Sequence, residues 1–206
     1  MQILSHRGFW LKNIEKNTTK AFEKSFELEF GTETDLRDFN GEIVISHDIP
    51  TSKSHITLDE FFEIYKSKNN NLPLALNVKS DGLQDKIIES ITKYNITNYR
   101  LFDMSIPDLV QTKYKKLNYL TRVSDLERPV LYEDSCGIWL DSFNSEFEQI
   151  NIIKSNLYNK KEIWIVSPEL HGRDENQFWA ELKNIKDTKN YYLCTDKPQK
   201  ARDIFL

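Results

Sequence analysis

The first 48 residues of the chain contain two histidines and a pair of carboxylates. His6 precedes Arg7, His47 follows some forty residues later, and Glu33 and Asp35 lie between them. Two imidazoles can exchange one proton near neutral pH, two carboxylates can hold a hard cation, and the guanidinium of Arg7 can neutralise phosphate charge. These residue types together are what metal-assisted cleavage of a phosphodiester requires.

The order and spacing of these motifs resemble the signature of the glycerophosphodiester phosphodiesterase family. The matching stretches are His6-Arg7-Gly8, Glu15-Lys16-Asn17-Thr18, Gly31-Thr32-Glu33-Thr34-Asp35 and Val44-Ile45-Ser46-His47-Asp48. Lys16 departs from the family pattern, because it separates Glu15 from Asn17. The resemblance returns at Leu74–Lys79 and weakly at Thr195–Pro198, and it implies a barrel enzyme that hydrolyses glycerophosphodiesters.

The carboxylate pair is a candidate metal site. Glu33 and Asp35 are two residues apart, so on a strand both side chains point to one face and could ligate one Mg²⁺ or Ca²⁺ ion through oxygen. The alternative is a pair of solvated surface acids. Relatives have Glu at a third ligand position, where this chain has Asn77, so the resemblance implies a weaker site that uses an amide oxygen.

Cations in the same motifs are candidates for contact with phosphate. Arg7 and Lys79 would bind the phosphoryl oxygens and stabilise the charge of the transition state, or they could form salt bridges at the barrel mouth. Glu169 is a further candidate for the substrate site and could replace the missing ligand charge. Its alternative role is a loop salt bridge with Arg173.

His6 and His47 are the candidate general acid and base. An unperturbed imidazole has a pKa near ~6.5, so each could deprotonate the nucleophile or protonate the leaving alkoxide. The two other histidines lack flanking motif residues. We expect His55 to be a loop residue, whereas His171 shares a loop with Glu169.

Short apolar runs that end in polar residues alternate with helical patterns along the whole chain. This alternation is typical of repeated βα units, and polar residues at the strand ends favour a (β/α)₈ TIM barrel, an α/β fold whose active site lies at those ends. We expect one domain over residues 1–206. The predicted strands are Ile3–His6, Thr32–Leu36, Leu74–Lys79, Arg100–Met104, Tyr119–Arg122, Gly137–Asp141, Ile163–Ser167 and Tyr192–Thr195.

The segment around His47 carries two further signals. Asn40-Gly41 predicts a tight turn followed by a short hairpin strand over 42–46, which would bring His47 back toward His6. Only a brief loop connects Asp48 to the next predicted helix at Thr57, where the family usually has a long insertion. We therefore expect an open mouth that discriminates weakly among small leaving alcohols.

Composition limits the possible partners. Charged residues make up 29% of the chain and the formal net charge is −4, which argues against general attraction to nucleic acid or to anionic membranes. No apolar run approaches the roughly 20 residues that a membrane-spanning helix needs. Because the first motif begins within a few residues of Met1, we expect a cytoplasmic protein without a leader. Cys136 and Cys194 lie in apolar runs, and we expect both to be buried thiols.

These observations predict a metal-dependent phosphoric diester hydrolase with one divalent cation and a small-molecule or polymeric phosphodiester as substrate. The resemblance implies that a substrate hydroxyl next to the phosphate attacks first and gives a cyclic intermediate. One alternative is a barrel that binds phosphodiesters or phosphosugars without turnover, because Asn77 weakens the metal site. Another is a metal-independent lyase similar to bacterial phosphatidylinositol-specific phospholipase C, which releases a cyclic phosphate.

Overall fold

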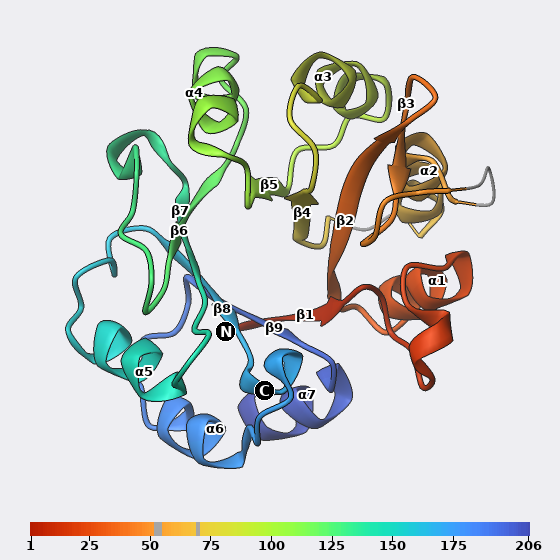
Figure 1. Cartoon of the computed structure of the whole chain (residues 1–206). Coiled ribbons are helices and arrows are strands. Elements are labelled where there is room, and N and C mark those ends of the chain that lie inside the picture. The colour runs from red at the N-terminus through yellow and green to blue at the C-terminus, as the bar shows by residue number, and fades with distance from the viewer. Residues whose placement is uncertain (52–54, 69–70) are drawn as a thin grey trace. The chain divides into compact units, whose positions relative to one another are not determined.

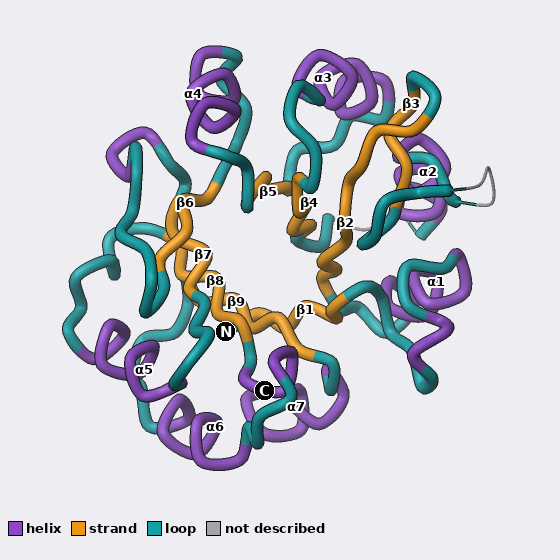
Figure 2. Tube along the Cα trace, in the orientation of Figure 1, coloured by secondary structure: helices purple, strands orange, loops and turns teal. Residues whose placement is uncertain are grey.

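Parallel strands alternate with helices in the computed structural model, which describes residues 1–51, 55–68 and 71–206 (Figure 1). The strands follow the order β5-β4-β2-β1-β9-β8-β7-β6, and β3 joins the sheet by pairing with β2. A helix follows most of the strands along the chain, as Figure 2 shows. This is the chain topology of a (β/α)₈ barrel, and the predicted fold class is confirmed.

The chain packs as two compact units. The first unit contains residues 1–4 and 120–206, and the second contains residues 5–119. The motif residues His6 to Lys79 all belong to the second unit, whereas Glu169 and His171 belong to the first.

The second unit begins within β1 and ends just after α4. It takes only the last two residues of β1 (Gln2–His6), whose first residues belong to the first unit. Its other regular elements are η1 (Asn13–Glu15), α1 (Thr19–Glu27), β2 (Gly31–Phe39), β3 (Glu42–Ile45), α2 (Leu58–Ser67), β4 (Leu74–Val78), α3 (Gln84–Lys93), β5 (Tyr99–Phe102) and α4 (Ile106–Tyr114). Parallel ladders join β2 to β4 and β4 to β5.

Local sequence signals explain where α1 and α2 begin. The Thr18 hydroxyl accepts a hydrogen bond from the N–H of Ala21 and so caps α1. Thr57 and Glu60 form a reciprocal capping box at the start of α2. Apolar residues three and four apart then bury one side of each helix, and the rings of Phe22 and Phe61 pack edge to face with centroids 4.7 Å apart.

The predicted hairpin is present between β2 and β3. Asn40 and Gly41 both have positive φ, which the tight turn requires, and Leu36 pairs with Ile45 in the antiparallel register. Strand β2 consequently runs to Phe39, three residues beyond its predicted end. This extension carries the chain back along β2, so that residue 46 returns to the level of Asp35.

The first unit contains the remaining strands and helices. They are β6 (Leu120–Val123), η2 (Tyr132–Asp134), β7 (Gly137–Leu140), α5 (Glu146–Lys154), β8 (Glu162–Val166), η3 (Pro168–His171), α6 (Asn176–Lys183), β9 (Tyr191–Thr195) and α7 (Pro198–Phe205). A loop with one short 3₁₀ turn, rather than an α-helix, connects β6 to β7.

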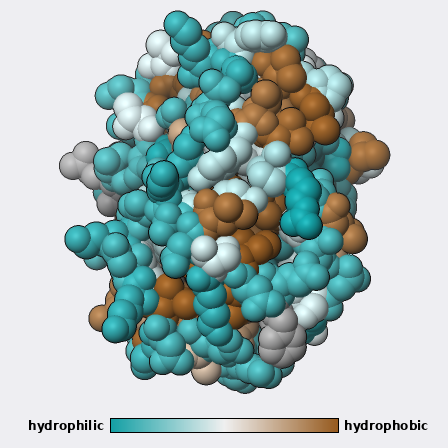
Figure 3. Space-filling view, turned by 90° about the vertical axis from the view of Figure 1, so that its left-hand side faces the viewer, coloured by the Kyte–Doolittle hydropathy of each residue, from teal (hydrophilic) through white to brown (hydrophobic). Residues whose placement is uncertain are grey.

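All the predicted strands are therefore present, with small differences at their ends. The prediction for the cysteines is confirmed only for Cys194, which is buried in β9, since Cys136 is partly exposed and precedes β7. Neither cysteine is in a disulfide. On the face of the molecule seen in Figure 3, hydrophilic side chains surround several separate apolar patches. No helix in the described ranges is both long enough and apolar enough to span a membrane.

Candidate active site

Two neighbouring strands of the second unit bring the predicted metal-site residues together. Glu33 and Asp35 are on β2 and Asn77 is on β4, and all three side chains are at most 7% exposed. Asp35 is the direct partner of Asn77 in the parallel ladder. His6, at the end of β1, places its Nε2 atom 3.8 Å from Oε2 of Glu33.

A left-handed turn after β1 positions Arg7. Arg7 has a φ of 59° and Gly8 a φ of 82°, so the chain reverses sharply at the end of the strand. The N–H of Arg7 donates to the carbonyl of Glu33 at 2.9 Å, and its own carbonyl accepts from the N–H of Asn17 at 3.0 Å. A Cβ on Gly8 would lie 2.8 Å from atoms of Ala21 at the start of α1, so this position requires glycine.

Asp35 is the centre of the polar cluster. Its Oδ2 atom lies 2.9 Å from Nε of Arg7 and accepts a hydrogen bond from Nδ2 of Asn17 at 3.0 Å. Its Oδ1 atom is 3.7 Å from Nζ of Lys79. The sequence analysis gave salt bridges as an alternative role for Arg7 and Lys79. Both side chains do contact the buried carboxylate of Asp35.

Two residues of the cluster had no role in the sequence-based prediction. Asn17 connects the chain after β1 to β2, since it bonds Asp35 and its Oδ1 accepts from the Thr34 hydroxyl at 2.9 Å. The sequence signal for Asn17 was its place in the motif Glu15-Lys16-Asn17-Thr18. Asp103, after β5, lies 3.8 Å from Nζ of Lys79. Its position at the end of a predicted strand was the only sign of it.

The donor set fits a divalent cation. Among the described residues, Glu33 Oε2, Asp35 Oδ1 and Asn77 Oδ1 are buried oxygens without a hydrogen-bond partner. Such atoms are costly to bury unless something binds them, and oxygen donors of this kind suit Mg²⁺ or Ca²⁺. The set has only two carboxylates, and no group of three or more His, Cys, Asp or Glu in the described ranges is arranged to hold a metal.

The electrostatics of Glu33 agree with a site for positive charge. Burial, followed by the negative charge of Asp35, raises the pKa of Glu33 to about 8. The cations Arg7 and Lys79 oppose this effect without overcoming it. A cation bound between the two carboxylates would offset their repulsion.

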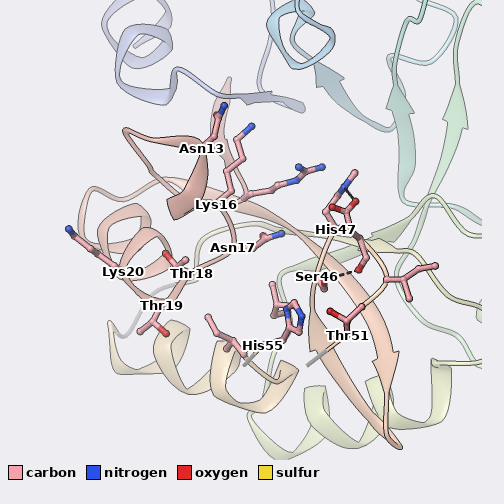
Figure 4. A pocket seen from close by; sticks show the side chains of 15 residues that line it. Asn13, Lys16, Asn17, Thr18, Thr19, Lys20, Ser46, His47, Thr51 and His55 are labelled. Atoms are coloured by element: carbon pink, nitrogen blue, oxygen red, sulfur yellow. Dashed lines mark hydrogen bonds and ion pairs between the residues drawn. The ribbon is translucent and has the colours of Figure 1, made fainter. Parts of the chain in front are cut away.

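The β2–β3 hairpin positions His47. The N–H of Ser46 donates to the carbonyl of Asp35 at 3.0 Å, which fixes the residue before His47 against β2. Nδ1 of His47 lies 2.8 Å from Oδ1 of Asp48, and the His47 side chain is 46% exposed. His47 lines a cavity of about 840 Å³ together with Arg7 and Asn17 (Figure 4).

Glu169 and His171 have defined partners within the first unit. The carboxylate of Glu169 accepts hydrogen bonds from the hydroxyls of Ser167 and Thr195 and from the N–H of Asp196. Burial raises its pKa in spite of these bonds. The contribution of Glu169 to the substrate or the metal site stays a prediction.

His171 also has a carboxylate partner, since its Nε2 atom lies 2.7 Å from Oδ1 of Asp141. Arg173, the predicted alternative partner of Glu169, donates to the carbonyls of Ser142 and Phe143. His55, which the sequence analysis treated as a loop residue, lines the same cavity as His47. No sequence signal pointed to that position, because its flanks match no motif.

The sequence matches no known family profile and no curated protein. Its structure resembles a Galdieria sulphuraria protein provisionally described as a glycerophosphodiester phosphodiesterase, with a TM-score of 0.75, 17% identity and coverage of 99% of this chain and 97% of the other. The fold is a (β/α)₈ barrel. The barrel also resembles the glycerophosphodiester phosphodiesterase of Agrobacterium tumefaciens strain C58, with a TM-score of 0.70, 13% identity and coverage of 98% and 99%.

A third similar structure is an Oleispira antarctica phosphodiesterase in complex with the product sn-glycerol-3-phosphate. Its TM-score is 0.62, with 16% identity and coverage of 99% of this chain and 96% of the other. The barrel also resembles the tryptophan synthase complex of Pyrococcus furiosus, with a TM-score of 0.60 and 11% identity. Barrels of different function thus share this fold, and the function must be argued from the side chains of the site.

Proposed function

We propose that the chain is a phosphoric diester hydrolase that acts on a glycerophosphodiester-like substrate with the help of one divalent cation. The observation that carries the proposal is the cluster around Asp35, in which Arg7 and Lys79 meet the predicted metal-site carboxylates. His6 lies beside this cluster. The similarity to solved glycerophosphodiester phosphodiesterases supports the same reaction class.

Glu33, Asp35 and Asn77 are the residues that would hold the cation, because each has a buried oxygen without a hydrogen-bond partner. A bound Mg²⁺ or Ca²⁺ would supply Lewis-acid stabilisation of the negative charge on the phosphoryl oxygens. Arg7 and Lys79 would bind the remaining phosphoryl oxygens, and the charge of both side chains persists through the reaction.

Two histidines divide the proton transfers. His6 would exchange a proton with the nucleophile or the leaving alkoxide at the carboxyl end of β1, and His47 would serve the opposite role from the hairpin. A carboxylate only accepts hydrogen bonds, so the contact with Asp48 favours the proton on Nδ1 of His47. Nε2 of His47 is then the nitrogen that accepts or donates the transferred proton.

The nucleophile is a hydroxyl of the substrate next to the phosphate, as the resemblance implies, or a water molecule. In the first case the hydroxyl gives its proton to the base and its oxygen bonds to phosphorus, while the bond between phosphorus and the leaving oxygen breaks and that oxygen takes a proton from the acid. Water then opens the cyclic diester. Both routes use the same acid and base, because each step removes one proton from the attacking oxygen and gives one to the leaving oxygen.

A phosphodiester panel tests this proposal. Glycerophosphocholine, glycerophosphoethanolamine and polymer fragments would each be incubated with Mg²⁺, Ca²⁺, Mn²⁺ or EDTA. Turnover that needs a cation and yields an acyclic phosphomonoester is the expected result. Full activity in EDTA with a cyclic product would instead identify the metal-independent lyase, and tight binding without turnover would identify the phosphodiester-binding barrel.

A further inference from the structure

The cavity beside Arg7 is positively charged. Its cationic lining side chains are Arg7, Lys16 and Lys20. Asp48 is the one carboxylate among the described lining residues. This charge contrasts with the formal net charge of −4 for the whole chain. Because cationic side chains outnumber the carboxylate in the lining, the cavity favours an anionic ligand.

The cavity continues outward from the proposed reaction centre. Arg7 and Asn17 line it, and both side chains contact Oδ2 of Asp35. Lys16 immediately precedes Asn17 in the sequence, and Lys20 lies in the first turn of α1. Figure 4 shows Lys20 on the side of the cavity away from His47, with Lys16 nearer to Asn13 and Asn17.

Lys16 lines this cavity, and its ammonium group contacts Trp10, which is not one of the lining residues. Its Nζ atom lies 4.3 Å from the ring centroid of Trp10, whose Nε1 donates to the carbonyl of His6 at 2.9 Å. A lysine stacked on an aromatic ring has fewer conformations to lose when an anion binds. Lys16 is also the residue by which the chain departs from the resembled motif.

The volume of the cavity exceeds what a small leaving alcohol needs. About 840 Å³ is toward the upper end of the range for small-molecule sites, which enclose ligands of drug size. A choline or ethanolamine leaving group would fill little of this space, and its positive charge would be repelled by Lys16 and Lys20.

We propose that the cavity binds the leaving-alcohol part of the substrate and that this part carries at least one further phosphate. The inference rests on the proposed function and narrows its substrate class to phosphodiesters with a second phosphate, either a polyol phosphate chain or a small phosphorylated alcohol. Lys16 and Lys20 hold that second phosphate, while Arg7 holds the one that is cleaved.

Three substrates of one series test the proposal. They are glycerophosphoglycerol, the same molecule with a phosphate on its far glycerol, and a glycerol phosphate chain of about six repeats. Two lysines, one half-buried (Lys16) and one exposed (Lys20), should together favour the phosphorylated substrate by about tenfold in kcat/KM, mostly through KM. A further rise for the longer chain would identify the polymer as the substrate, whereas equal values would identify the small phosphorylated alcohol.

The double variant Lys16→Gln/Lys20→Gln should reduce the preference for the second phosphate to about twofold or less. Lys20→Gln alone should reduce it in part, and it avoids any disturbance of the Trp10 contact. The control is Lys66→Gln/Lys116→Gln, which removes the same charge from exposed positions of the same unit outside the cavity. An unchanged preference in the first double variant, or an equal loss in the control, would overturn the proposal.

Failure of the proposed function would give a different result. If wild-type protein cleaves none of the three substrates with any cation, the hydrolase assignment fails, and calorimetry with inorganic pyrophosphate then tests the cavity alone. Binding that weakens about tenfold in Lys16→Gln/Lys20→Gln but not in the control supports an anion site. Absence of pyrophosphate binding by the wild type overturns it.

Discussion

Asp35 and Asn77 are direct partners in the parallel ladder between β2 and β4, and each keeps one buried oxygen without a hydrogen bond. The register places a carboxylate beside an amide at the same level of the sheet. Because the amide is neutral, it contributes less to cation binding than a carboxylate would. One substitution in this pair would therefore change the charge of the proposed metal site.

Asn77→Glu should tighten Mg²⁺ and Mn²⁺ binding by about tenfold or more, because it adds a negative charge beside Asp35. Calorimetry on the purified protein measures the change without any substrate. Asn77→Leu serves as the control, since it keeps the approximate volume and removes the oxygen donor. Unchanged affinity in both variants would show that residue 77 does not contact the cation.

Removal of either proposed proton-transfer group should slow turnover. His6→Ala and His47→Ala should each lower kcat by about 10²-fold or more, the usual scale for a general acid or base, while circular dichroism stays unchanged. Asp48→Asn should lower kcat by less than about tenfold, because the Asp48 side chain is 93% exposed and its contact with His47 is solvated. Near-normal turnover of either alanine variant would remove that histidine from the mechanism.

Much of this site was predictable because strands and catalytic motifs leave local signals. Alternating apolar runs located the strands, and the spacing of Glu33 and Asp35 placed both on one face of β2. The Asn40-Gly41 turn predicted the hairpin that positions His47. These features depend on neighbours within a few residues, which the sequence displays directly.

The remaining features depend on residues that are distant in the sequence. Asn17 reaches Asp35 because its backbone adopts a φ of 58°, which no pattern indicates. His55 lines the same cavity as Arg7 and Asn17, which are distant from it in the sequence, and Glu169 accepts hydrogen bonds from hydroxyls of two separate segments. Such contacts arise from tertiary packing, so residue type and spacing alone could not predict them.

The turn at Gly8 offers a test of how Arg7 is positioned. Gly8→Ala should destabilise the protein by about 2–4 kcal/mol, since the new Cβ meets Ala21 atoms at 2.8 Å in addition to the strain of a positive φ. The control is Gly82→Ala, where φ is 85° and the added Cβ has no neighbour within 4 Å. That variant should lose only about 1 kcal/mol.

Urea unfolding measures both glycine variants, and steady-state kinetics compares their kcat/KM values. Gly8→Ala should also lower kcat/KM, because any shift of α1 displaces the Arg7 turn, whereas Gly82→Ala should keep wild-type kinetics. Equal losses of unfolding free energy in the two variants would mean that the structure accommodates the Cβ of residue 8 against Ala21 without further destabilisation.

Glu175 links α6 to α7 by ion pairs and makes stability depend on pH. Burial of its carboxylate raises the pKa, but hydrogen bonds from Lys197 and Lys200, at 2.7 Å each to Oε1, outweigh burial and lower the pKa of Glu175 to about 2. A folded-state pKa below the unfolded value stabilises the protein above the unfolded pKa. This contribution is complete above about pH 5 and is lost as the pH falls toward 2.

Glu175→Gln should therefore lower the free energy of unfolding at pH 7 by about 1–2 kcal/mol, a discounted value because both lysines are nearly half exposed. Urea titrations of wild type and variant at pH 7, 5, 4 and 3 measure the difference, which should be constant from pH 7 to 5 and smaller at each lower pH. Glu181→Gln, at an exposed ion pair with Lys154, is the control and should change stability by less than about 0.5 kcal/mol. A difference for Glu175→Gln that stays the same down to pH 3 would mean that the lysine pairs do not stabilise the charged carboxylate.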